Sequence, residues 1–64
     1  MYEIIGDYCF DLENDCYVNS KGEKLDIHFD GGKCYAVFEN GIVIEEKNED
    51  RLVKKIEKFC ENNF

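Results

Sequence analysis

The spacing of apolar residues changes once along this chain, and the change separates two kinds of secondary structure. In several segments between Tyr2 and Glu46, apolar and polar residues alternate, which is typical of strands with one buried face. After Lys47 the apolar residues recur with the spacing of a single helix face. These residues are Leu52, Val53, Ile56, Phe59 and Cys60. The sequence therefore predicts an α+β fold in which antiparallel strands precede one C-terminal helix, with Asn48 as its N-cap.

Turn-forming residues divide the alternating part of the chain into four or five strands. Gly6 is expected to bend or break the first strand, and Asn14–Asp15 should form the turn that follows it. Asn40–Gly41 favours a two-residue turn, which would place Val37 opposite Ile44. The predicted strands are Tyr2–Glu13, Cys16–Val18, Glu23–Phe29, Lys33–Glu39 and Ile42–Glu46. We expect an antiparallel β-meander with the helix packed on one face, in a single small domain over residues 1–64.

The alternation also assigns residues to the two faces of the sheet. The face expected beneath the helix is uniformly apolar, and its residues are Leu25, Ile27, Phe29, Cys34, Ala36, Phe38 and Val43. The opposite face is mixed, with His28 and several carboxylates around an apolar middle. That middle consists of Tyr35, Val37, Ile42 and Ile44. If it is left uncovered, such a patch is typical of an interface. The alternative is that the first strand folds over it.

The charge of the chain is strongly acidic and unevenly distributed. Its 64 residues carry a formal net charge of −7, and the first 20 contain five acidic residues and no basic one. This excess argues against binding to nucleic acid through phosphate neutralisation and against docking on an anionic membrane. The N-terminal residues lack the basic and long apolar regions of a signal peptide, and no apolar run has the length of a membrane span. We therefore predict a cytoplasmic protein that binds neither nucleic acid nor membrane directly.

The acidic residues of the predicted first strand share one side of it. Because alternate residues of a strand lie about 6.8 Å apart, they would form a ladder of carboxylates with a charge density like that of a phosphate row. Its members are Glu3, Asp7, Asp11 and Glu13, with Asp15 in the following turn. Such a ladder would be attracted to a basic surface of another protein. The aromatic side chains of Tyr2, Tyr8 and Tyr17 would add contact area. The alternative is that an acidic edge strand only prevents aggregation of sheets.

No motif in the sequence supports catalysis, a metal site or a cofactor. The acidic residues 11–15 have the spacing of the first calcium ligands of an EF-hand, but the glycine and glutamate that such a loop needs are replaced by Cys16 and Gly22. The four cysteines lack zinc-knuckle spacing, and we expect them to remain thiols in a reducing compartment. His28 has an aspartate and a tyrosine as predicted neighbours, a trio that is more often a surface hydrogen-bonded group than a proton-transfer site. We therefore predict that the protein is not an enzyme.

In its size, acidity and lack of catalytic motifs, the chain resembles the small anti-CRISPR and related anti-defence inhibitors of phages. Some of those proteins mimic nucleic acids, a property that the carboxylates of residues 3–15 would support. The resemblance implies a non-enzymatic inhibitor, encoded by a phage and acting in the bacterial cytoplasm. Such an inhibitor would occlude the basic surface of a nucleic-acid-handling enzyme. The alternative function is a small structural or regulatory homodimer, joined through the apolar patch on the sheet.

Overall fold

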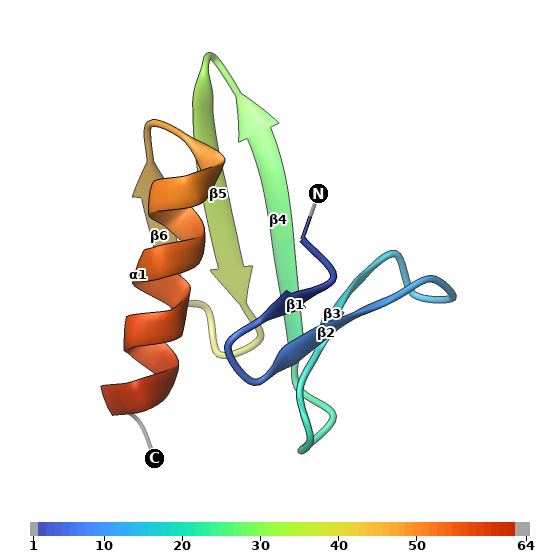
Figure 1. The fold of residues 1–64 in the computed structure, drawn as a ribbon. Coiled ribbons are helices and arrows are strands. Elements are labelled where there is room, and N and C mark those ends of the chain that lie inside the picture. Colours follow the sequence, from blue (N-terminus) through green and yellow to red (C-terminus); the bar gives the residue numbers. More distant parts are fainter. Residues whose placement is uncertain (1, 63–64) are drawn as a thin grey trace.

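The computed structural model, which describes residues 2–62, shows six strands followed by one helix (Figure 1). The elements are β1 (Ile4–Ile5), β2 (Tyr8–Asp11), β3 (Cys16–Val18), β4 (Lys24–Asp30), β5 (Lys33–Phe38), β6 (Val43–Glu46) and α1 (Glu49–Asn62). Each strand is antiparallel to its neighbour, and the order in the sheet is the order in the sequence. The sheet curls into a half-barrel, and α1 packs against β1, β5 and β6, so it bridges the two ends of the sheet. The predicted α+β meander is confirmed, but it has six strands in place of the four or five expected.

The additional strand arises at Gly6, where the chain reverses. Ile5 pairs with Tyr8, and Gly6–Asp7 is the turn between them. Gly6 has a φ of 59°, a left-handed conformation that glycine adopts without steric cost. A Cβ at this position would also lie 3.0 Å from the Sγ of Cys60. The predicted single strand from residue 2 to 13 is therefore wrong, although its break at Gly6 is confirmed.

The register between β5 and β6 differs from the prediction by one residue. Val37 pairs with Val43, because Glu39–Gly41 forms a three-residue loop in place of the expected two-residue turn. The Phe38 N–H donates to the Ile42 carbonyl at 2.8 Å and closes this loop. A shift of one residue exchanges the two faces of a strand. Val43 is consequently 58% exposed, whereas Ile44 packs against the core, the reverse of the expected arrangement.

The helix is confirmed in its position, its cap and its buried face. The Oδ1 of Asn48 accepts a hydrogen bond from the Arg51 N–H at 2.9 Å, which satisfies one free donor at the helix start. The predicted stripe is buried apart from Phe59, which is partly buried. The core that these residues complete consists of Ile5, Tyr8, Tyr17, Leu25, Cys34, Ala36, Phe38, Leu52, Val53, Ile56 and Cys60. Among residues 2–62, no helix has both the length and the apolar composition that a membrane span needs.

Strand β4 is much longer than its neighbour β3. Their pairing consists of Tyr17 with Leu25 and Val18 with Lys24, whereas β5 pairs with β4 as far as Asp30. The register between β4 and β5 agrees with the prediction and places Phe29 on the helix side of the sheet. Phe29 is nevertheless 62% exposed, so its predicted burial beneath the helix is wrong. The reason is that α1 packs on β1, β5 and β6 and leaves the end of β4 uncovered.

Candidate functional site

The five N-terminal carboxylates do not form the predicted ladder. The chain reversal at Gly6 places Asp7 in the β1–β2 turn, at one end of β2, and Asp11 at the other end. Because β1 runs antiparallel to β2, the reversal also removes Glu3 from the line of Asp7 and Asp11. The exposed Glu3 precedes β1, while Glu13 and Asp15 lie in the loop between β2 and β3. The ladder is therefore wrong, and the acidic residues divide between the two ends of the β2 strand.

Three of the carboxylates, those of Asp11, Glu13 and Asp15, remain together at the end of β2 and in the loop that follows it. The Asn14 side-chain amide donates to the Oδ2 of Asp11 at 2.7 Å, and the Glu13 N–H donates to its Oδ1 at 3.0 Å. These two hydrogen bonds lower the pKa of Asp11, because they stabilise the carboxylate form. Asp15 has a φ of 53°, a left-handed conformation that aspartate tolerates better than most residues. The loop therefore has a folded conformation of its own and carries three negative charges.

Two of the three tyrosines expected on the binding surface belong to the core. Tyr8 and Tyr17 are only 7% and 5% exposed, and burial raises the pKa of both phenols. The Tyr17 hydroxyl donates to the Tyr2 carbonyl at 2.6 Å. The Tyr2 hydroxyl donates to the Oδ1 of Asp50 on α1. Tyr8 and Tyr17 thus do not supply the exposed contact area that was expected of them, and Tyr2 attaches the N-terminal segment to the helix start.

An open groove of about 320 Å³ lies between the β2–β3 loop and the uncovered end of β4. Its apolar lining is formed by Phe10, Cys16, Tyr17, Ile27 and Phe29, with Phe10 and Tyr17 in edge-to-face contact at a centroid distance of 5.2 Å. Its charged residues are the three carboxylates Asp15, Asp26 and Glu49. No Lys, Arg or His is among the described residues that line it. The groove therefore combines exposed apolar surface with negative charge of a single sign.

Several residues of this groove were not among the site residues predicted from the sequence. The sequence predictions place Phe29 in the core and Asp26 on the rim of the outer-face patch, and they give Glu49 no binding role. The sequence did contain one signal for them, which is the length of the predicted strands. A strand of three residues at Cys16–Val18 cannot cover a neighbour that extends from Glu23 to Phe29.

The outer face of the sheet carries the second predicted surface, with altered membership. His28 and Tyr35 are cross-strand neighbours, as expected, and their rings are in edge-to-face contact with centroids 5.5 Å apart. Val37 pairs with Val43 on this face, whereas Ile44 lies on the core side and Ile42 precedes β6. The inclusion of Ile42 and Ile44 in this surface is therefore wrong, because the longer loop shifts the register. The surface is formed by Tyr35, Val37 and Val43, with His28 beside them.

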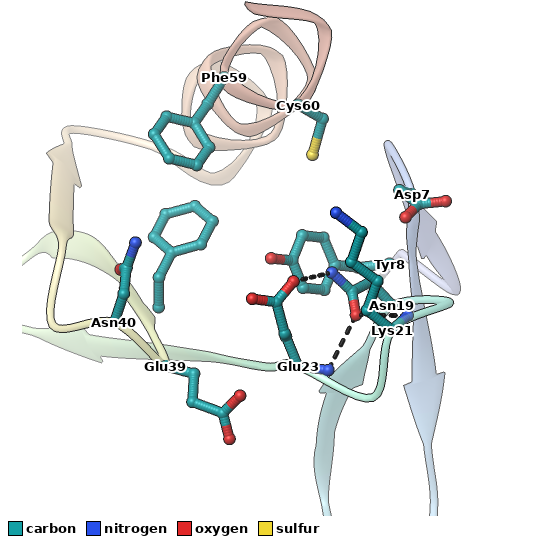
Figure 2. A pocket seen from close by; sticks show the side chains of 10 residues that line it. Asp7, Tyr8, Asn19, Lys21, Glu23, Glu39, Asn40, Phe59 and Cys60 are labelled. Carbon is teal, nitrogen blue, oxygen red and sulfur yellow. Dashed lines mark hydrogen bonds between the residues drawn. The ribbon is translucent and has the colours of Figure 1, made fainter. Parts of the chain in front are cut away.

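A smaller pocket of about 190 Å³ lies beside the C-terminal part of α1 (Figure 2). Tyr8 forms part of its lining, and Cys60 points into it from the helix. The Asn19 side chain is used within its own turn, since its Oδ1 accepts the Lys21 and Glu23 N–H groups and its Nδ2 donates to Glu23 Oε1. Charges of both signs line this pocket, so it lacks the single-sign character of the groove.

The four cysteines are free thiols, with Cys9 exposed and Cys16, Cys34 and Cys60 buried. The expected placement of Cys34 and Cys60 in the core is confirmed. Within residues 2–62, no three side chains among His, Cys, Asp and Glu are grouped so that they could hold a metal ion.

The chain matches no protein-family model, no curated protein and no solved structure.

Proposed function

We propose that this chain is a non-enzymatic binding protein that engages a basic surface of another protein. The observation that carries the proposal is the groove beside β4, where apolar side chains are bordered by Asp15, Asp26 and Glu49 without a basic residue. The adjacent loop adds Asp11 and Glu13 to the same end of the molecule.

The two components of this surface would contribute in different ways. Long-range attraction from a net charge of −7 raises the rate of encounter with a basic partner, and salt screens it. Exposed ion pairs contribute little affinity individually, whereas burial of apolar groups such as Phe29 stabilises the complex once it has formed. A basic partner with apolar side chains near its charges would therefore bind most tightly.

The partner class that we propose is an enzyme that binds nucleic acid, since its phosphate-binding surface is basic. Occupation of that surface would exclude the nucleic acid sterically and electrostatically. The small size and the acidity of the chain support an inhibitor of the phage anti-defence type, acting in the bacterial cytoplasm.

A capture experiment tests this proposal. The full chain, immobilised, is exposed to a lysate of the cell that naturally produces it, and bound proteins are released with heparin or duplex DNA. We expect a basic nucleic-acid-binding protein that these polyanions displace, because they compete for the same surface. The paired reversal Glu13→Lys with Asp26→Lys should abolish its capture. Glu57→Lys with Glu61→Lys, on α1, is the matched control and should retain it. Capture that polyanions do not displace, or that both double variants retain equally, would refute the proposal.

A homodimer is the second candidate function, and the observation that favours it is the cross-strand pair of the half-buried Val37 and the exposed Val43. The dimer would join the outer faces of two sheets through these valines and Tyr35. Light scattering at micromolar concentrations should then give a mass that depends on concentration, and Val43→Asp should abolish the dependence. A monomeric mass at every concentration would exclude this function.

A further inference from the structure

We infer that the unpaired edge of β4 binds an extended segment of the basic partner as an additional strand, in which basic and apolar side chains alternate. The inference rests on the proposed function and assigns it a docking site and a mode of recognition. It is carried by three features of β4: its free backbone groups, its exposed apolar face and its acidic outer face.

The backbone of β4 is available for pairing beyond Leu25. From Asp26 to Asp30 the strand pairs with β5 on one side, and in the described part of the chain no strand pairs with it on the other. Figure 1 shows the β2–β3 hairpin diverging from this part of β4. A strand edge of this kind presents unpaired N–H and C=O groups to which an extended peptide can add.

The hydrogen bonds at the start of β4 show which backbone groups face the free edge. The Glu23 carbonyl accepts a bond from Asn19 on the β3 side, and the Lys24 carbonyl accepts one from Glu39 on the β5 side. These groups alternate along an antiparallel strand. Continuation of the alternation directs the N–H and C=O groups of Ile27 and Phe29 toward the free edge. Two residues therefore offer four backbone hydrogen-bonding groups to an added strand.

The side chains of β4 determine what kind of strand would fit. Ile27 and Phe29 lie on the concave face, together with Phe10 in the groove. Asp26, His28 and Asp30 lie on the opposite face, where the carboxylates of Asp26 and Asp30 would be cross-strand neighbours of the added residues. Directly opposed residues of unlike charge stabilise strand pairing. A segment with apolar residues on one face and Lys or Arg on the other matches both faces of β4 at once.

A second copy of this chain is not the occupant that these charges favour. Antiparallel pairing of two β4 edges about His28 would place Asp26 of each copy opposite Asp30 of the other. Like charges that are directly opposed destabilise pairing. The aspartates thus disfavour self-association at this edge and favour a basic strand.

Fluorescence anisotropy with labelled peptides tests the inference on the full chain. The probe is an eight-residue peptide of alternating lysine and valine, and its controls are the same residues in two blocks and a peptide of alternating glutamate and valine. We expect the alternating basic peptide to bind at least tenfold more tightly than either control. Equal affinities for the alternating and the block peptide would overturn the inference, because charge alone would then explain the binding.

Backbone methylation separates strand addition from contact between side chains. Two versions of the probe carry the same number of N-methyl groups, one on the valines and the other on the lysines. Because only alternate N–H groups of an added strand face its neighbour, one version should lose at least tenfold in affinity and the other should retain it. Equal affinities for the two versions would overturn the inference.

Charge reversal on β4 provides the protein side of the test. Asp26→Lys with Asp30→Lys should weaken binding of the alternating peptide at least tenfold, whereas Glu57→Lys with Glu61→Lys should leave it nearly unchanged. Far-ultraviolet circular dichroism of both variants establishes that they fold. If polyanions displace a captured basic partner but the two methylated probes bind alike, the inference fails and the proposed function stands. If no basic partner is captured, the proposed function fails, whatever the peptides do.

Discussion

Strand length separates the two parts of this molecule. β1, β2 and β3 have two, four and three residues, whereas β4 and β5 have seven and six. The N-terminal part contains the acidic loop and has no basic residue through residue 20. The helix in the C-terminal part contains equal numbers of acidic and basic residues. Where the short and long strands meet, β4 has no strand partner on its β3 side from Asp26 to Asp30 in the described part of the chain. The comparison indicates that the longer strands and the helix supply most of the stability, and that the mismatch with the short strands creates the binding groove.

The largest expected effect is the loss of an apolar side chain from the C-terminal part. Leu52 on α1 is completely buried, and Leu52→Ala should cost about 2–5 kcal/mol in the free energy of unfolding. A domain of this size has only about 3–5 kcal/mol in total, so the variant should be largely unfolded. Leu12→Ala, in the acidic loop, is the control, because Leu12 is 87% exposed. Urea denaturation followed by circular dichroism measures both, and similar losses would contradict the comparison.

The turn at Gly6 should be more sensitive than the turn at Gly31. Both glycines have a φ of 59°, so alanine carries the same backbone penalty of about 1 kcal/mol at each. At Gly6 the new Cβ would also lie 3.0 Å from the Cys60 Sγ, whereas at Gly31 it has nothing within 4 Å. Gly6→Ala should therefore destabilise the protein more than Gly31→Ala in the same urea titration. Equal losses would mean that the close approach of α1 to this turn is unimportant.

Removal of the helix cap should have an effect of intermediate size. Asn48→Ala deletes the acceptor for the Arg51 N–H and should cost about 1 kcal/mol. Asn48→Asp restores an acceptor and should recover most of that loss. Thermal unfolding of the two variants beside the natural chain measures the difference. A melting temperature for Asn48→Ala equal to that of the natural chain would argue against this cap.

The smallest expected effect is on the titration of Asp11. Because hydrogen bonds from Asn14 and the Glu13 N–H lower its pKa, the stability they contribute is present above the ordinary pKa of an aspartate. That stability is lost as the pH falls through the lowered pKa. Asn14→Ala should raise the pKa of Asp11, as measured by nuclear magnetic resonance titration. Asn40→Ala, in the β5–β6 loop, should leave it where it is, and a pKa that is unchanged in Asn14→Ala would disprove the role of this hydrogen bond.

The elements with regular patterns were predictable from the sequence. The helical stripe from Leu52 to Cys60 specified the buried face of α1, and Asn48 specified its start. The Gly31–Gly32 turn set the register between β4 and β5. In these segments one arrangement alone places the apolar residues on a single face of the element, so the pattern specifies that arrangement.

The sequence predictions were wrong in the segments where two different arrangements would bury apolar residues equally well. Ile4 and Ile5 are adjacent, so the alternation does not distinguish a continuous strand from a reversal at Gly6. Ile42, Val43 and Ile44 form an apolar run, and either register of β6 would bury part of it. The acidic ladder depended on the first of these choices and the outer-face patch on the second. The groove depends on which part of β4 has no strand on its β3 side. This is a tertiary feature that the difference in length between the predicted strands only suggested.

Hydrogen exchange at the free edge of β4 tests the central claim most directly. Amide exchange rates of the full chain are measured by nuclear magnetic resonance, with and without a saturating amount of the alternating lysine and valine peptide. Strand addition predicts that the Ile27 and Phe29 amides become strongly protected while those of α1 keep their rates. Saturation by the peptide with unchanged exchange at Ile27 and Phe29 would show that the edge of β4 is not the docking site.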